Sequence, residues 1–281
     1  MTARILDGNS IFRKMKVKIL KEIQLKVSVN DRRPGLAVIY VGKNPASEIY
    51  IERKFLAFKS LGLVFKSYNL EENVHEYNIL KLIEDLNEDK EIDGIVVQLP
   101  VPKQINYFKI IEKINPIKDV EGIHPYNVGK FVQKNRRNFS CTSKGIITLL
   151  KWYKINISGM NAVVIGTSNI VGIPIGMQLL LHGCTITMID KYTRNIHKYV
   201  KSADLLIVAI GKPNFIRGEW IKNGAVVIDV GINKLKNKIV GDVCYMEAKE
   251  KASWITPVPG GVGPMTIISL IVNVIKAFEK K

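Results

Sequence analysis

Cysteine is scarce in this chain of 281 residues: only Cys141, Cys184 and Cys244 are present, and they lie far apart. No CxxC spacing occurs, which argues against a zinc knuckle and against a disulfide framework, so no metal site is expected. Thiols that stay reduced are typical of the cytosol. The first ten residues, MTARILDGNS, lack the apolar run of a secretory signal. We therefore expect a cytoplasmic protein.

Acidic residues are also few. The chain has 25 Asp and Glu against 42 Lys and Arg, which gives a formal net charge of +17. Such a balance favours anionic partners. Only nine of the basic residues are Arg, however, and no helix-turn-helix, RNP-like aromatic pattern or zinc finger accompanies them. We expect no nucleic-acid partner. A solvated basic surface without a dedicated role and a surface that serves anionic small molecules both stay open.

Charged residues are absent between Ile155 and Ile189, a stretch long enough to span a bilayer. Glycines and a proline divide it into short apolar runs, which favours a buried strand–turn–helix–strand and no membrane contact. Hydrophobic residues make up 47% of the chain, an ordinary globular value. The length predicts one large or two medium domains.

Helix-like and strand-like segments alternate along the chain, which is typical of α/β proteins. In the first half we expect helices near 11–27, 45–61 and 76–86 and strands at 35–41, 63–68 and 94–99. An irregular stretch at 115–143, with the basic cluster at 134–137, is interpreted as an interdomain connection. In the second half we expect helices at 144–153, 171–182 and 265–278 and strands at 162–165, 184–189, 205–209 and 226–230.

Gly166 to Gly172 follows a buried strand and opens a helix, where backbone N–H groups and the helix dipole can hold a pyrophosphate. The match to GxGxxG is poor, because Ser168 replaces the second glycine and the last glycine comes one residue late. An ordinary tight turn is the alternative. After the next strand, Asp190 favours the free ribose 2′-hydroxyl of NAD, whereas the adjacent Lys191 favours the 2′-phosphate of NADP.

Tyr50 and Lys54 lie four residues apart on the helix that Asn44-Pro45 opens, and therefore on one face. An ordinary surface pair is the alternative to catalysis. Gln98 ends a buried strand just before Pro100, at the sheet edge where ligands of open α/β sheets bind. An amide there can orient an ammonium group. The three residues are our catalytic candidates.

The loop PGGVGPMT, residues 259–266, contains three glycines and two prolines before an apolar helix. Such a loop lets backbone approach a ligand closely. A simple helix-entry turn is the alternative interpretation.

Together these segments resemble the bifunctional methylenetetrahydrofolate dehydrogenase/cyclohydrolase family, known in bacteria as FolD. The resemblance spans nearly the whole chain and is most specific in QLP at 98–100 and PGGVGPMT at 259–266. It is also carried by segments spread between these two: Val41-Gly42, Pro45-Ala46-Ser47, Tyr50, Lys54, Asp93-Gly94, Lys118-Asp119-Val120, Gly122, His124 to Gly129, Cys141-Thr142, Gly166, Ser168, Val171-Gly172, Asp229-Val230-Gly231 and Gly241-Asp242-Val243.

The resemblance implies two reactions. NADP takes a hydride from 5,10-methylenetetrahydrofolate, and water then opens the methenyl product to 10-formyltetrahydrofolate. Lys54 would act as base, its pKa lowered by burial or by neighbouring positive charge, while Gln98 holds it and Tyr50 orders the folate ring. Folate contacts are expected from Tyr50, Gln98, Glu121, Pro259, Gly260 and Gly263. Cofactor contacts are expected from Gly166, Thr167, Ser168, Lys191 and Ile232.

Three departures from the family pattern stand out. Glu121 replaces an Asp at a position expected to bind the pterin, which keeps the charge on a longer arm. Ser140-Cys141-Thr142-Ser143 replaces Pro-Cys-Thr-Pro in a linker. Thr167 stands where many relatives have Arg, so Lys191 would be the phosphate anchor, and we favour NADP over NAD.

The fold expected is two α/β domains around a cleft, the second a Rossmann-type dinucleotide domain. The first comprises residues 1–139 with the returning helix 265–281, and the second residues 140–264. A homodimer through the cofactor domain is implied by the resemblance. A different dehydrogenase, a nonspecific nucleic-acid binder and a non-catalytic folate or dinucleotide binder are the rival functions.

Overall fold

The computed structural model describes the chain except residues 1, 31, 135–139, 237 and 280–281. The chain divides into two compact units. The six-stranded unit comprises residues 1–14 and 142–268, and the three-stranded unit comprises residues 15–141 and 269–281. Each unit is thus assembled from two separate pieces of chain. Most of the basic cluster at 134–137 lies outside the described residues.

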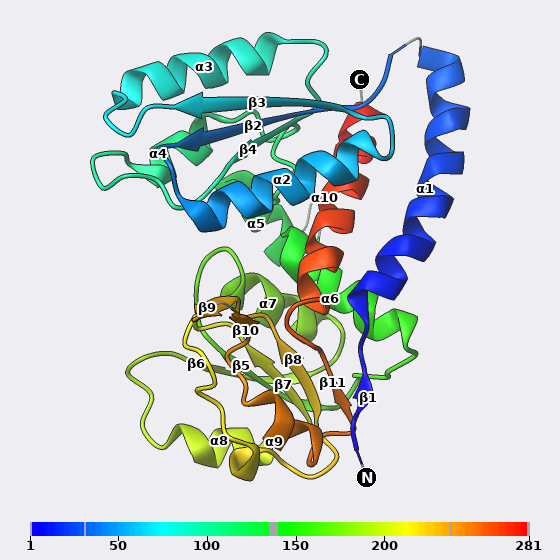
Figure 1. The fold of residues 1–281 in the computed structure, drawn as a ribbon, viewed down its shortest axis with the longest axis vertical. Coiled ribbons are helices and arrows are strands. Elements are labelled where there is room, and N and C mark those ends of the chain that lie inside the picture. The colour runs from blue at the N-terminus through cyan, green and yellow to red at the C-terminus, as the bar shows by residue number, and fades with distance from the viewer. Residues whose placement is uncertain (1, 31, 135–139, 237, 280–281) are drawn as a thin grey trace. The chain divides into compact units, whose positions relative to one another are not determined.

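The three-stranded unit contains a parallel sheet in the order β3-β2-β4 (Figure 1). Its strands are β2 (Gly35–Val41), β3 (Val64–Leu70) and β4 (Gly94–Val97). Figure 1 shows α2 (Pro45–Lys59) and α3 (Glu76–Glu88) on opposite sides of this sheet. Every residue of β4 is buried, as expected for a strand covered on both faces. Two shorter helices follow, α4 (Tyr107–Lys113) and α5 (Pro125–Val132).

The six-stranded unit contains a parallel sheet in the order β1-β11-β8-β7-β5-β6. Its strands are β1 (Arg4–Ile5), β5 (Asn161–Ile165), β6 (Thr185–Ile189), β7 (Leu205–Val208), β8 (Val226–Asp229) and β11 (Trp254–Ile255). Its helices are α6 (Cys141–Trp152, whose first residue belongs to the other unit), α7 (Gly172–Leu181), α8 (Ile196–Ser202), η1 (Gly218–Trp220) and α9 (Tyr245–Lys249). A hairpin is formed by β9 (Asn233–Leu235) and β10 (Lys238–Val240).

Besides α6, which crosses by a single residue, two described helices begin in one unit and end in the other: α1 (Gly8–Asn30) and α10 (Val262–Phe278). The structure therefore divides the chain differently from the expected boundaries. Residues 1–14 join the six-stranded unit, because β1 pairs with β11 at the edge of its sheet. The last helix begins at Val262 rather than at residue 265, since Pro264 is tolerated in a first helical turn.

The apolar stretch from Ile155 to Ile189 forms β5, α7 and β6, as the strand–turn–helix–strand interpretation required. In the described part of the chain, no helix combines the length and apolar character needed to cross a bilayer.

Candidate active site

Helix α2 is anchored to the end of β4 through its first turn. The Asn44 side chain accepts a hydrogen bond from the backbone N–H of Ser47 (3.1 Å), which caps the helix. The Ser47 hydroxyl in turn donates to the Leu99 carbonyl (3.1 Å). This link holds α2 beside the segment that carries Gln98.

Lys54 and Gln98 are in direct contact. The Lys54 ammonium donates to Oε1 of Gln98 at 3.0 Å, and Lys54 is only 7% exposed. The Gln98 amide nitrogen donates to the Leu99 carbonyl (2.9 Å), which leaves the amide oxygen for the amine. The backbone N–H of Gln98 continues the sheet by donating to Ile39. The strand end thus orients an amide that fixes the position of the amine.

Glu121 is the charged neighbour of this pair, with Oε1 3.9 Å from Nζ of Lys54. The charged group next to the Lys54 amine is thus a carboxylate, whereas the sequence analysis considered a positively charged neighbour. Burial raises the pKa of Glu121, while Lys54 opposes the rise and Asp119 adds to it. About a quarter of the Glu121 side chain remains exposed, so part of its carboxyl group can meet a ligand.

Asp119 builds the loop that presents Glu121. Its Oδ1 accepts the backbone N–H groups of Gly122 and Ile123, and its Oδ2 accepts that of His124 and the Asn127 amide. Lys118 donates to two backbone carbonyls, so the Lys-Asp-Val segment serves the loop's structure. The sequence analysis did not assign this role. The only indication of this role in the sequence is that Asp119 is an acidic residue in a segment rich in residues that favour turns.

The Val120 carbonyl next to Glu121 is held from two further segments. It accepts hydrogen bonds from the Asn273 amide of α10 (2.8 Å) and from the Cys141 thiol (3.1 Å). The backbone N–H of Cys141 donates to the Glu121 carbonyl. Cys141 therefore serves as an anchor of this loop.

Two tyrosines belong to the same unit as this cluster. Tyr50 lies one turn before Lys54 on α2, and burial raises the pKa of its phenol. Burial and the carboxyl groups of Glu121 and Asp119 raise the pKa of Tyr107 well above its usual value. Tyr107 opens the short helix α4, and no sequence motif marked it as a neighbour of Glu121. Both phenols stay protonated and can donate hydrogen bonds.

The turn between β5 and α7 needs its two glycines for steric reasons. Gly166 has φ +111°, and a Cβ there would lie 2.2 Å from the Ala209 carbonyl oxygen. A Cβ on Gly172 would lie 1.9 Å from the Gly166 carbonyl oxygen. Gly172 therefore provides the close strand–helix approach that the third glycine of GxGxxG provides.

The turn that leads into α7 presents polar groups to solvent. Thr167 and Ser168 are exposed, and the Ser168 hydroxyl accepts the backbone N–H of Val171 at 3.2 Å. An exposed turn that leads into a helix and begins with a glycine at φ +111° fits a dinucleotide pyrophosphate, because the backbone can approach the phosphates closely there.

Asp190 and Lys191, the two candidate contacts of the cofactor ribose after β6, differ in the interactions that their side chains already make. Asp190 accepts the backbone N–H of Tyr192 (2.9 Å) and the Thr193 hydroxyl (3.1 Å) through the same oxygen, Oδ1. Lys191 is exposed, with its ammonium 4.9 Å from the centre of the Tyr192 ring. The aspartate stabilises its own turn, and the lysine is accessible.

A buried pair of aspartates organises the loops that follow β7 and β8. Asp242 accepts the backbone N–H groups of Ile210 and Gly211, while Asp229 accepts those of Gly231, Asp242 and Val243. Burial, together with the charge of Asp242, raises the pKa of Asp229 to about 7. Ile232, a predicted cofactor contact, follows this network and is 41% exposed. The sequence analysis named these aspartates only as part of the resemblance.

The glycine-rich loop before α10 belongs to the six-stranded unit. Its Gly260 has φ +110° and accepts the backbone N–H of Asn9 through its carbonyl (3.1 Å). Pro259 is exposed, and the space where a Cβ of Gly263 would stand is open. The structure thus brings Lys54, Gln98 and Glu121 together in one unit and places Pro259, Gly260 and Gly263 in the other.

These features are typical of a dinucleotide-dependent α/β enzyme with a separate catalytic unit. The six-stranded unit has parallel strands and a glycine turn before a helix. The three-stranded unit has a buried amine held by an amide. Models of the tetrahydrofolate dehydrogenase/cyclohydrolase family match the chain twice. The catalytic domain matches residues 6–121, and the NAD(P)-binding domain matches residues 140–281. The chain belongs to this family.

Solved structures agree over almost the entire length. The bifunctional FolD enzyme of Campylobacter jejuni is 42% identical, with a TM-score of 0.96 and 99% of each chain covered. FolD of Trypanosoma brucei, described in complex with NADP and an inhibitor, is 34% identical, with a TM-score of 0.96 and coverage of 100% of this chain and 98% of that one. The bifunctional enzyme of Thermoplasma acidophilum is 33% identical, with a TM-score of 0.90 and coverage of 99% and 98%.

Proposed function

We propose that this chain oxidises 5,10-methylenetetrahydrofolate with NADP and hydrolyses the methenyl product to 10-formyltetrahydrofolate. The observation that carries the proposal is the buried Lys54 amine, held 3.0 Å from the Gln98 oxygen at the carboxyl end of β4 and 3.9 Å from Glu121. Proton transfer to and from water and a folate nitrogen needs such a positioned group.

In this proposal Lys54 moves the protons of the hydrolytic step. Gln98 keeps the amine in place, because its own N–H group is committed to Leu99. Glu121 binds the pterin, whose amino and ring N–H groups are donors that a carboxylate accepts. Tyr50 orders the folate ring from the same face of α2.

Hydride transfer asks mainly for positioning. Gly166, Thr167, Ser168, Lys191 and Ile232 would hold NADP, which supplies the hydride acceptor when bound. Pro259, Gly260 and Gly263 would contact the folate through backbone.

Preference for NADP over NAD rests on the turn after β6. Oδ1 of Asp190 is already shared between Tyr192 and Thr193, whereas the exposed Lys191 has no carboxylate within ion-pair distance among the described residues. An ammonium without a carboxylate partner favours the 2′-phosphate. Lys191→Gln is expected to raise the KM for NADP about tenfold and leave the KM for NAD unchanged. Equal effects on both cofactors would contradict this assignment.

A homodimer is part of the proposal. Ile173, Leu180 and Met188 expose 38%, 52% and 37% of their surface on α7 and the edge strand β6. Residues 173 and 180 are seven apart and share one helix face. An exposed apolar face beside a free strand edge is a surface that a second copy can cover. Leu180→Lys with Met188→Lys is expected to convert the dimer to a monomer in light scattering. The exposed, polar-face control His197→Lys is expected to leave the dimer intact.

The test of function is an absorbance assay. Methylenetetrahydrofolate is supplied with NADP or NAD, and methenyltetrahydrofolate is supplied alone. In Lys54→Met, kcat for hydrolysis of the methenyl compound is expected to fall by more than about a hundredfold. The variant should still bind NADP, which gives a matched control for folding. Full hydrolytic activity in Lys54→Met would show that another group moves the protons, and no turnover in the unmodified enzyme would leave a folate or dinucleotide binder.

A further inference from the structure

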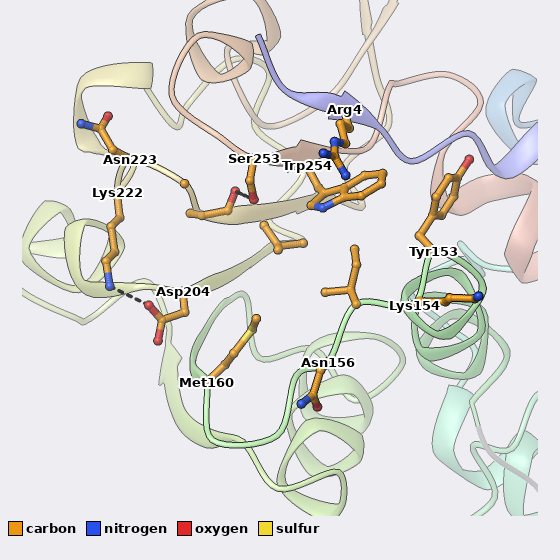
Figure 2. Close-up of a pocket in the computed structure, with 14 residues that line it drawn as sticks. Arg4, Tyr153, Lys154, Asn156, Met160, Asp204, Lys222, Asn223, Ser253 and Trp254 are labelled. Atoms are coloured by element: carbon orange, nitrogen blue, oxygen red, sulfur yellow. Dashed lines mark hydrogen bonds and ion pairs between the residues drawn. The ribbon is translucent and has the colours of Figure 1, made fainter. Parts of the chain in front are cut away.

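The six-stranded unit contains a pocket at the end of its sheet opposite to the Gly166 turn. Figure 2 shows this pocket, which has a volume of about 470 Å³. Its walls come from the residues at which β1, β8 and β11 begin, including Arg4, Val226 and Trp254. The Gly166 turn follows the carboxyl end of β5, so this pocket is a separate place on the same sheet. Its volume falls within the range of about 300–1,000 Å³ typical of small-molecule sites.

The lining combines an apolar surface with a fixed aromatic pair. Ile155, Met160 and Val226 supply aliphatic surface. The rings of Tyr153 and Trp254 lie 5.3 Å apart at 55°, and the Tyr153 hydroxyl is fixed because it accepts the backbone N–H of Asp7. The indole N–H of Trp254 has no acceptor among the described residues. A flat ring can lie against this surface, and a ligand oxygen can accept from the indole.

The charge of the pocket is positive. Arg4 lies over the Trp254 ring, with its guanidinium carbon 5.2 Å from the ring centre (Figure 2). No carboxylate of the described residues lies within ion-pair distance of Arg4 or of Lys154 at the rim. Asp204 is the acidic residue of the lining, and it is occupied by Lys222 (2.6 Å) and by the backbone N–H of Asn161. The Lys154 ammonium points away from the pocket in Figure 2, so the Arg4 guanidinium is the group that remains for an anion.

We propose that this pocket binds an aromatic carboxylic acid, with its ring against Trp254 and its carboxylate on Arg4. A guanidinium that lies on an indole keeps its N–H edge for bidentate contact with a carboxylate. The site adds a binding function to the cofactor unit that the two folate reactions do not use.

The test measures binding of 2-naphthoate to the full-length enzyme by titration calorimetry in the presence of saturating NADP. Its neutral isostere 2-naphthamide is titrated in parallel. We expect saturable binding of the acid and about tenfold weaker binding of the amide. No saturable binding up to about 5 mM, or equal binding of both compounds, would overturn the proposal. Competition between 2-naphthoate and NADP would place the probe in the cofactor site and would overturn it as well.

Two variants locate the site. Arg4→Gln is expected to weaken binding of the acid about tenfold and to leave the amide unchanged, since only the acid uses the charge. The backbone pairing of β1 with β11 does not depend on the Arg4 side chain. Lys201→Gln, an exposed charge on α8, is the matched control and should change neither compound. Trp254→Leu should weaken both. Unchanged binding in Arg4→Gln, with unaltered melting temperature and NADP affinity, would contradict the assignment.

Discussion

At the scale of single residues, Glu121 is the departure whose consequences the structure makes visible. Its arm reaches within 3.9 Å of Lys54, and Asp119 holds the loop that carries it. The extra methylene is therefore directed at the amine that we propose moves protons. The carboxylate belongs to the same local network as Lys54 and Gln98.

The raised pKa of Glu121 predicts a pH effect. As pH falls, Glu121 takes up its proton at a higher pH than an ordinary carboxyl group, because burial disfavours its charged form. Folate binding that uses the carboxylate is thus lost earlier on the acid side. The acid limb of kcat/KM against pH should lie above the ordinary Glu range. In Glu121→Gln this limb should disappear, and KM for the folate should exceed the wild-type value at pH values above the limb, where the wild-type carboxylate is charged. A limb unchanged in the variant would assign it to another group.

At the scale of elements, the contact between β5 and α7 is governed by glycine. Gly172→Ala would place a Cβ 1.9 Å from a backbone oxygen that cannot move without displacing the turn. We expect a loss of about 1–3 kcal/mol in free energy of unfolding and weaker NADP binding. The control is Gly129→Ala on α5, where nothing lies within 4 Å of the new methyl group. The control should be neutral or slightly stabilising. Urea unfolding measures the free energy of unfolding, and cofactor titration measures NADP binding. Equal losses in Gly172→Ala and Gly129→Ala would show that the turn relaxes around the new methyl group.

The ends of β7 and β8 are coupled through Asp229, and the sign of its pH effect follows from its raised pKa. Between its unfolded pKa near 3.8 and its folded pKa of about 7, the folded state holds a proton that the unfolded state has released. Stability contributed by this group therefore falls as pH rises from about 4 to 7 and changes no further above that range. Asp229→Asn should flatten this slope, as measured by melting temperature from pH 4.5 to 8. A slope that survives in the variant would point to other groups.

The longer helices and strands could be predicted from the sequence because their hydrophobic residues recur with a regular spacing. Strands such as β2 and β5 and the helix α3 were found close to their observed bounds, and the α/β fold class and the family are confirmed. The two-residue strands β1 and β11 are too short to show an alternation of apolar and polar residues. The sequence therefore did not indicate that residues 1–14 belong to the six-stranded unit. The contact between Lys54 and Gln98 was anticipated from position. The role of Asp119 depends on folding of its own loop, which no spacing encodes. The roles of the site residues stay predictions.

At the scale of the whole molecule, the N-terminus is a structural part of the six-stranded unit. Ala3 and Leu6 are buried, and β1 forms the edge of the sheet beside β11. Deleting residues 2–6 removes this apolar surface and leaves β11 as a bare edge. We expect about 2–4 kcal/mol of destabilisation in urea unfolding and increased aggregation. Replacement of Thr2 alone, an exposed residue, should have no effect. Unfolding midpoints that match for the deletion and the full chain would show that β1 contributes nothing to stability.

The interleaved chain also sets an order for synthesis. Because β1 pairs with the strand at residues 254–255, the sheet that contains residues 4 and 5 cannot be complete before residues 254 and 255 have been made. The three-stranded unit likewise lacks its second piece until residues 269–281 have been made. Domains usually fold as units while the chain emerges. In this protein neither unit can be completed from one continuous piece of chain, so apolar surface of both units stays uncovered until α10 has been made.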